Sequence, residues 1–284
     1  VADMLVNNID ENLLRIVPMK NKKYFRADCF AYENEDKISI LYEHYSYKNQ
    51  KGKIACIDLP CNHEFSEEKT LLEKPYHLSY PFVFEHSEEL YCIPESCEAK
   101  SVDLYKIDRQ SKSLSFCKTI LQGFDAVDNT LLLYNNTWWL FCTKHSEEAN
   151  TNLYLYFSEN FDGPYVPHKA NPIKTDVRSA RPAGIPFVLN NILYRPAQDC
   201  SKVYGGRIAI NKINVLDKNN FSEETVMHLG PLTKSAYNKG FHTMTTAGDF
   251  TFFDCCKNIF SFHSFGYQLK RKFKKLLSSK SNGQ

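Results

Sequence analysis

The sequence of 284 residues contains no long apolar run and only 11 Gly and 12 Pro residues. Its longest apolar stretches, such as 130–134 and 138–142, have the length of strands and fall far short of the roughly 18 residues that a membrane-spanning helix needs. No charged-then-apolar signal segment is visible at the start. Because the chain opens on Val1, we expect it to be part of a longer protein. The 20 Phe and 17 Tyr residues argue against disorder and favour one or two domains with a full core.

The sequence also lacks the short motifs of several enzyme classes. It has no phosphate-binding glycine loop, no zinc-binding helix motif and no nucleophile elbow. Ten cysteines are present, but none has the Cys-x-x-Cys spacing that places two thiolates on one zinc ion. Several, such as Cys92 and Cys142, lie in apolar strand patterns. We therefore expect reduced core thiols in a cytoplasmic protein.

A net charge of one strong sign is missing as well, because the formal net charge is only +2. From Lys257 onward there are seven basic residues and no acid, which leaves the rest of the chain at −5. This balance argues against nucleic acid as a partner of the body. In the tail, Leu269, Phe273, Leu276 and Leu277 form an apolar stripe on a cationic helix. The helix is typical of a segment that lies on an anionic membrane, or of a solubilising helix or linker to a missing domain.

What the sequence does contain is a repeated hairpin of two apolar strands around a polar turn. Five such hairpins begin near residues 26, 78, 126, 180 and 240. Their equivalent positions are separated by 52, 48, 53 and 61 residues and are Asp28, Tyr80, Asp128, Arg181 and His242. A period near 50 with several strands per unit predicts a propeller. We expect an all-β, five-bladed β-propeller over 24–256, an N-terminal extension over 1–23, and a short basic C-terminal helix within 257–284.

The first strands of all blades would converge on one central channel, so that residues about 50 apart become neighbours. Asp28 and Asp128 occupy matching positions in otherwise apolar strands. A carboxylate in such a strand is costly unless it is paired or faces a polar channel. Two acids facing each other are the groups that glycoside chemistry uses. The alternative is that both acids are structural and cap turns at the mouth of the channel.

Longer strings of the sequence resemble a known module. The sequence is similar to the propeller at the N-terminus of plant glucosamine inositolphosphorylceramide transferases and to the related module of bacterial formyltransferase-like proteins. The resemblance covers roughly residues 24–255. It is carried by the strings at 77–84, 93–96, 171–172, 180–184 and 194–201, followed by Tyr204-Gly205.

A more distant resemblance is to the five-bladed glycoside hydrolases of family forty-three. That resemblance implies a base Asp in blade one, a second Asp in blade three and an acid Glu in blade four. Asp28 and Asp128 match the first two, but Arg181 stands at the third position. A guanidinium does not give up a proton at neutral pH. Glu95, at the end of the second hairpin, is the candidate for a replacement acid.

The remaining candidate residues point to a ligand with a negative charge. Arg181 and Arg195 would form a set of donors for a carboxylate or phosphate. His77 and His242 would add groups that titrate near neutral pH. The alternative is that the two arginines pair with Asp28, Asp128 or Asp199 and hold the blades together. Further ligand-binding candidates on the resembling strings are Tyr80, Gln198, Asp199 and Tyr204.

We therefore expect a carbohydrate-active propeller that binds or acts on an anionic or phosphorylated glycan, a sugar phosphate or a glycolipid. If it is an enzyme, it would be a glycosyltransferase or a glycosidase-like protein, with Asp28 as base, Asp128 as orienting carboxylate and Glu95 as acid. The alternative is a non-catalytic sugar-binding module of a larger formyltransferase or glycosyltransferase. No cofactor is expected. A third possibility, beside the enzyme and the binding module, is a metal-dependent site with a calcium ion near His242. The predicted location is the cytoplasm, at the inner face of the membrane.

Overall fold

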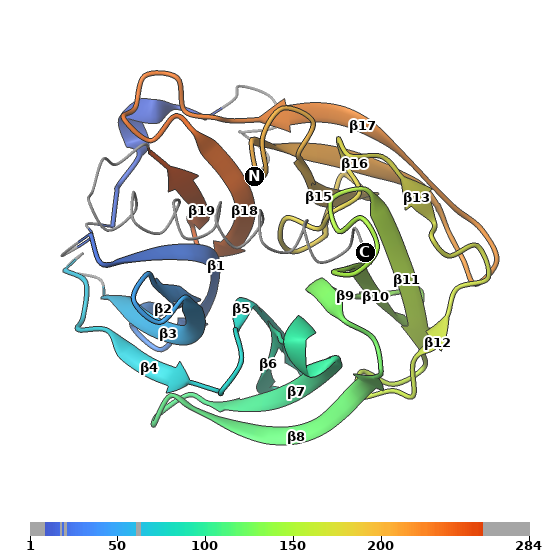
Figure 1. The fold of residues 1–284 in the computed structure, drawn as a ribbon, viewed down its shortest axis with the longest axis horizontal. Coiled ribbons are helices and arrows are strands. Elements are labelled where there is room, and N and C mark those ends of the chain that lie inside the picture. The colour runs from blue at the N-terminus through green and yellow to red at the C-terminus, as the bar shows by residue number, and fades with distance from the viewer. Residues whose placement is uncertain (1–8, 18, 20–21, 61–63, 258–284) are drawn as a thin grey trace, which may run out of the picture.

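The computed structural model describes residues 9–17, 19, 22–60 and 64–257. These residues form β-sheets, with two short 3₁₀ turns, η1 (Glu11–Leu13) and η2 (Cys97–Ala99). The sheets are antiparallel and stand around one central axis, as Figure 1 shows. The all-β propeller that the hairpin repeat predicts is confirmed. Among the described residues there is no helix with the length and apolar character to cross a membrane.

Each sheet runs outward from the axis in chain order. The first contains β1 (Tyr24–Asn34), β2 (Lys37–Ser46), β3 (Lys51–Pro60) and β4 (Lys69–Leu72). The second contains β5 (Ser79–His86), β6 (Glu89–Glu95), β7 (Ser101–Asp108) and β8 (Ser113–Gln122). The third contains β9 (Ala126–Tyr134), β10 (Thr137–Lys144), β11 (Asn152–Ser158), β12 (Val166–Pro167) and β13 (Lys174–Thr175). The fourth contains β14 (Phe187–Leu189), β15 (Ile192–Asp199), β16 (Arg207–Leu216) and β17 (Phe221–Leu229).

The number of complete blades differs from the prediction. The described residues form four complete blades, whereas the fifth unit contributes only the two strands β18 (Gly240–Ala247) and β19 (Phe250–Cys256). The prediction of five complete blades is therefore wrong for the part of the chain that the structure describes. The fifth hairpin itself is present as predicted, as the antiparallel pair β18–β19. The predicted basic C-terminal helix lies outside the described residues.

The N-terminal segment covers the two-stranded sheet. Ile9 and Leu14 pack against the buried cluster that includes Phe241 and Met244 of β18. The carboxylate of Glu11 accepts hydrogen bonds from backbone N–H groups at residues 233 and 234. This segment therefore shields an apolar cluster that the fourth sheet and β18 share.

The core consists of several layers between the sheets. Because successive strand residues point to opposite faces and each blade is covered on both sides, neighbouring apolar residues enter different layers. Trp138 packs in the layer shared by the first three sheets, and Trp139 in the layer between the third and fourth. Strand alternation by itself predicts one tryptophan in the core and one on the surface, but both are buried. The blade has no solvent-facing side here.

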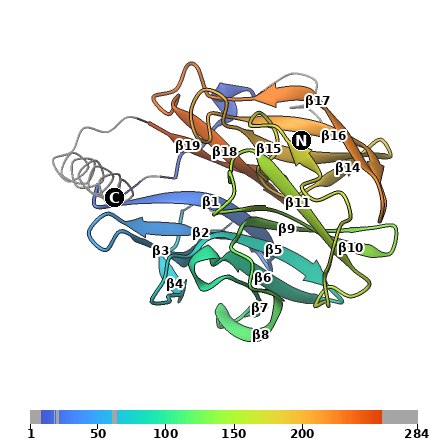
Figure 2. The same cartoon turned by 45° about the vertical axis from the view of Figure 1, so that its right-hand side comes forward.

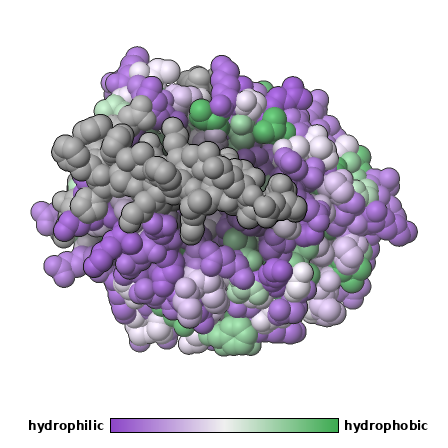
Figure 3. Space-filling model, viewed as in Figure 1, coloured by the Kyte–Doolittle hydropathy of each residue, from purple (hydrophilic) through white to green (hydrophobic). Residues whose placement is uncertain are grey.

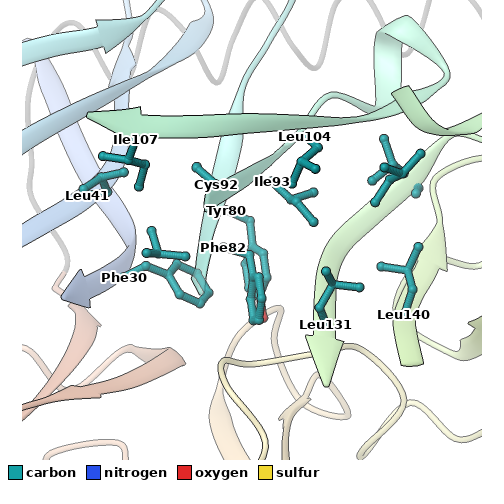
Figure 4. Close-up of a cluster of buried hydrophobic side chains, with 14 of the residues drawn as sticks. Phe30, Leu41, Tyr80, Phe82, Cys92, Ile93, Leu104, Ile107, Leu131 and Leu140 are labelled. Atoms are coloured by element: carbon teal, nitrogen blue, oxygen red, sulfur yellow. The ribbon is translucent and has the colours of Figure 1, made fainter. Parts of the chain in front are cut away.

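Phe30, Tyr80 and Phe82 lie together among aliphatic side chains in the layer that the first three sheets share (Figure 4). The ring of Phe30 meets Tyr80 edge to face at 4.8 Å and Phe82 at 5.6 Å. Such contacts add to the free energy gained from burial. The nine cysteines in the described part of the chain are free, but only Cys56, Cys92, Cys97 and Cys142 are buried, so the expectation of core thiols holds for these four.

Candidate functional site

Three first strands carry one residue each in a left-handed backbone conformation beside the axis. The φ angles of Asp28, Tyr80 and Asp128 are 54°, 40° and 53°. In all three sheets the register between the first two strands shifts at this point. A bulge of this kind redirects a side chain out of the regular alternation. Positive φ in residues with a Cβ carries a cost of about 1–3 kcal/mol, and such conformations concentrate at functional sites.

The fourth and fifth units complete the ring differently. β18 has a register shift between Phe241 and Met244, which places His242 and Thr243 in a bulge. Arg181 precedes a proline and lies outside any strand, on the segment that leads to β14. The five positions that the repeat predicts as equivalent therefore all interrupt regular β-structure. Figure 2 shows the sheets that carry them from a second direction.

One half of the site is built around Asp28. Its Oδ1 accepts a hydrogen bond from Thr243 Oγ1 at 3.1 Å and lies 3.3 Å from His242 Nε2. The other ring nitrogen of His242, Nδ1, lies 2.7 Å from Asp254 Oδ2. The backbone N–H of Asp28 also donates to Asp254 Oδ2, at 2.9 Å. The imidazole thus lies between two carboxylates and links the first sheet to the last.

These contacts set the charges of this half. Burial opposes ionisation of Asp28, but the hydrogen bond and the charge of His242 outweigh it, so the pKa of Asp28 lies below its usual value. Burial also opposes the charged form of His242, but the negative charge of Asp254 raises the pKa of His242 well above its usual value. This half therefore holds an ionised Asp28 beside a cationic imidazole.

The other half is built around Asp128. Arg181 Nε donates to Asp128 Oδ2 at 2.5 Å, and Gln198 Nε2 donates to the same oxygen at 2.9 Å. The backbone N–H of Asp128 donates to Glu95 Oε2 at 3.1 Å. Burial raises the pKa of Glu95 to about 8, and the negative charge of Asp128 adds to the rise. Glu95 therefore carries a proton at neutral pH.

We refer to Asp28, Glu95, Asp128, Arg181, His242 and Asp254 as the axial cluster. It contains an ionised carboxylate, a protonated carboxylic acid and two cations that are each paired with an acid. Groups of this kind can form hydrogen bonds with the hydroxyls of a sugar, both as donors and as acceptors. They can also supply or remove a proton.

Sequence reasoning missed two acids near the axis, Asp254 and Glu43. Glu43 is 6% exposed, and its Oε1 lies 3.5 Å from His77 Nε2. His77 Nδ1 accepts the backbone N–H of Gly52, at 2.9 Å, so that Nε2 faces the acid. The sequence does hold a signal for them: Glu43, Glu95 and Asp254 each stand at or near the end of the second strand of a hairpin.

Three predicted ligand-binding residues have other roles in the structure. Tyr80 is 0% exposed, and its hydroxyl bonds Thr130 and the backbone N–H of Gly184, so it ties three blades together rather than facing a ligand. Arg195 is also 0% exposed. Its guanidinium donates to Glu223 Oε1 at 2.6 Å, which agrees with the structural alternative although the partner is a different acid from those expected.

Asp199 is likewise buried and bonds Ser201 and Arg207, which lie at the two ends of the adjoining loop. It therefore shapes the chain rather than lining the axis. Gln198 does reach the axial cluster, but it is 0% exposed and supports Asp128 from within. Tyr204 lies over the cluster, with its ring centroid 4.9 Å from Arg181 Cζ.

Asp28, His242 and Asp254 are the described residues whose donor atoms lie close enough together, within 4.8 Å, to hold a cation. Their chemistry fits calcium poorly, because calcium prefers six to eight oxygen ligands and an imidazole must be neutral to bind a metal. Both ring nitrogens of His242 already face carboxylate oxygens. The three side chains satisfy one another by hydrogen bonds.

Comparisons with known proteins agree with this architecture. The solved structure of a family 62 α-L-arabinofuranosidase from Coprinopsis cinerea matches with a TM-score of 0.63 at 11% identity, over 87% of this chain and 90% of that one. A family 117 glycoside hydrolase from Zobellia galactanivorans matches with a TM-score of 0.57 at 12% identity, over 76% of this chain and 73% of that one. At such identities the likeness concerns the fold.

Sequence comparison is more specific. Glucosamine inositolphosphorylceramide transferase 1 of Oryza sativa subsp. japonica is 33% identical over 210 residues, which is 71% of this chain and 28% of the rice protein. The Arabidopsis thaliana protein of the same name is 33% identical over 222 residues, 76% of this chain and 28% of its own length. The chain thus spans little more than a quarter of these relatives. Neither is a formyltransferase-like protein, so that part of the resemblance stays a prediction.

The family model described as "Glucosamine inositolphosphorylceramide transferase 1, N-terminal" matches residues 15–245, which includes all of the four complete blades and most of β18. By this match, the chain belongs to the family of the N-terminal domain of glucosamine inositolphosphorylceramide transferase 1.

Proposed function

We propose that the chain is a carbohydrate-binding module whose axial cluster holds the sugar headgroup of a glycolipid for a transferase. The observation that carries the proposal is the convergence of buried acids from the first, second, third and fifth sheets on one axis, each held by hydrogen bonds. Buried charges are expensive, and a set aimed at one place is typical of a ligand site. The family and the glycosidase-like fold support a sugar as the ligand.

Arg181 favours binding over ordinary glycoside hydrolysis. It stands where the resembling hydrolases have their acid, and it forms an ion pair with Asp128. A permanently charged guanidinium can orient a carboxylate but does not protonate a leaving oxygen. Hydrolysis by the usual pair of acids is therefore not assembled at these positions.

The finer expectation of an anionic ligand has weaker support. Arg181 donates to Asp128 and to Asn150 Oδ1, and Arg195 is paired with Glu223 away from the axis. A phosphate would have to compete with Asp128 for Arg181. We therefore base the proposal on the sugar part of the headgroup.

A second candidate function is proton-transfer catalysis, and the contrast between Glu95 and Asp28 favours it. Burial raises the pKa of Glu95 to about 8, whereas His242 keeps the pKa of Asp28 below its usual value. Two carboxyl groups whose pKa values are driven apart can serve as acid and base. In such a mechanism Glu95 would protonate a leaving group and Asp28 would activate a hydroxyl.

Isothermal titration calorimetry can test the binding proposal with glucosamine, myo-inositol phosphate and vesicles that contain a glycosylated inositolphosphorylceramide. We expect wild type to bind one of these and Asp28→Asn or Arg181→Ala to weaken binding by about tenfold or more, because each removes one charge of a buried pair. Arg178→Ala is the matched control, since Arg178 is exposed and pairs with Asp176 outside the cluster.

Turnover of an aryl glycoside or of an activated sugar, lost in Glu95→Gln, would instead establish the catalytic candidate. Failure of wild type to bind any of the three probes would overturn the proposal of a sugar-binding site. Placement in the cytoplasm, contact of the basic tail with an anionic membrane and a transferase domain on the same polypeptide remain proposals. The basic tail lies outside the described residues.

A further inference from the structure

The loop over residues 200–206 joins β15 to β16 and is fixed at both ends. Asp199 Oδ1 accepts the backbone N–H of Ser201 at 3.0 Å, and Asp199 Oδ2 accepts Arg207 Nε at 2.8 Å. Near the tip, the carbonyl of Gly205 accepts the backbone N–H of Phe241 at 2.8 Å. A loop held in this way presents its side chains in one arrangement, which lowers the entropic cost of binding.

Tyr204 on this loop touches both halves of the axial cluster. Its ring centroid lies 4.9 Å from Arg181 Cζ, and its ring meets that of His242 at 5.5 Å and 66°. Arg181 is the partner of Asp128, and His242 lies 3.3 Å from Asp28. The ring of Tyr204 therefore stands over the two places where sugar hydroxyls could meet carboxylates.

The ring combines close contacts with a large exposed surface. Tyr204 is 55% exposed, whereas the side chains of Arg181 and His242 beneath it are only 13% and 17% exposed. Figure 3 shows that hydrophilic residues cover most of the described surface on the face viewed in Figure 1, with apolar residues in small groups. An exposed aromatic side chain fixed beside buried charges thus offers an apolar face next to polar groups.

We propose that Tyr204 is the platform on which a six-membered polyhydroxylated ring of the ligand stacks. The proposal rests on the proposed sugar-binding function and names the part of the ligand that the site reads. The C–H face of such a ring is apolar and its edge carries hydroxyls, so it can cover an aromatic ring while its edge reaches acids. A phosphate group has no such face, and Arg181 is already engaged.

Four variants test this role by saturation-transfer NMR and calorimetry, with D-glucosamine, myo-inositol and inorganic phosphate as probes. Tyr204→Phe keeps the ring and is expected to bind within about twofold of wild type. Tyr204→Leu keeps bulk without the aromatic face, and Tyr204→Ala removes both; each is expected to weaken ring binding about tenfold, the upper part of the range for an aromatic contact. Val203→Ala is the matched control, because Val203 is 54% exposed on the same loop.

The outcomes separate this proposal from the one on which it rests. Wild-type-like affinity of Tyr204→Leu or Tyr204→Ala, together with loss of binding in Asp28→Asn, would overturn the platform and leave the sugar-binding function standing. Binding of phosphate but of neither ring compound would overturn the platform too. Absence of binding of these probes and of the glycolipid vesicles by folded wild type, checked by its thermal transition, would remove both proposals together.

Discussion

Glu95 and Asp28 are both buried carboxyl groups, yet their surroundings push them toward opposite protonation states. Asp28 receives hydrogen bonds from Thr243 and Tyr80 and lies beside a cationic imidazole. Glu95 accepts one backbone N–H and lies beside a second carboxylate, Asp128. Because both groups are buried, the donors and charges beside each carboxyl group decide which of them keeps its charge.

The raised pKa of Glu95 predicts a pH-dependent difference in stability between wild type and Glu95→Gln. The folded protein holds this proton up to about pH 8, whereas the unfolded chain releases it near pH 4.3. Between these pH values the folded state holds a proton that the unfolded chain has lost. The free energy of unfolding of wild type therefore falls as pH rises. The side chains of Glu95 and Asp128 also share a hydrogen bond, and a neutral glutamine can donate to Asp128 without losing stability in this way.

We therefore expect the free energy of unfolding of Glu95→Gln, relative to wild type, to increase from pH 5 to pH 8 and then to level off above the folded pKa. Urea denaturation at a series of pH values measures this difference. Subtraction cancels the titrating groups that do not interact with Glu95. A difference that does not change with pH would show that Glu95 is ionised throughout.

At the scale of elements, the segment before β14 comes very close to β18 at one residue, Gly184. Gly184 pairs with Met244 of β18 and has a φ of +127°. A Cβ at this position would lie 1.8 Å from the backbone oxygen of Met244, a distance at which something must move. The fourth and fifth units approach this closely because the position has no side chain.

Gly184→Ala is expected to lower the free energy of unfolding by about 3 kcal/mol or more, because the clash is with backbone and adds to an unfavourable φ. Gly123→Ala is the matched control: Gly123 also has a positive φ, of +78°, but nothing lies within 4 Å of its added Cβ. Its cost should be limited to about 1–2 kcal/mol from the backbone conformation. Equal losses in the two variants, measured by urea denaturation, would contradict the importance of the close approach.

For the whole molecule, the N-terminal segment covers the cluster that the fifth sheet shares with the fourth. Leu14 packs against this cluster, whereas the neighbouring Leu13 is 80% exposed. We expect Leu14→Ala to lower the free energy of unfolding by about 1–2 kcal/mol, because the site is only partly buried. Leu13→Ala should stay within about 0.5 kcal/mol of wild type.

Denaturation monitored by circular dichroism compares these two variants directly. A Leu14→Ala protein as stable as Leu13→Ala would show that the segment does not support the fifth sheet. A single cooperative transition with a lower midpoint is the expected behaviour of a ring that unfolds as one unit.

Periodicity in the sequence is sufficient to identify the repeating hairpins, and it aligns Asp28, Asp128, Arg181 and His242 with one another. Such alignment works because each unit repeats the same alternation of strands and turns around one axis. Glu95 is also identified in this way, since it ends a hairpin strand as residues of the other units do. By contrast, Tyr80 and Arg195, which are also predicted to bind the ligand, are both buried.

The order of apolar strands and polar turns along the chain thus determined the propeller and the ring of candidate positions. Tertiary structure alone decided how many blades are complete, which partner each buried charge meets and which aromatic ring faces outward. The physical reason is that strand periodicity is a local property of the chain. The ion pair of Arg181 with Asp128 joins residues 53 apart, and that of Asp28 with His242 joins the first sheet to the last. Such contacts exist only once the ring has closed.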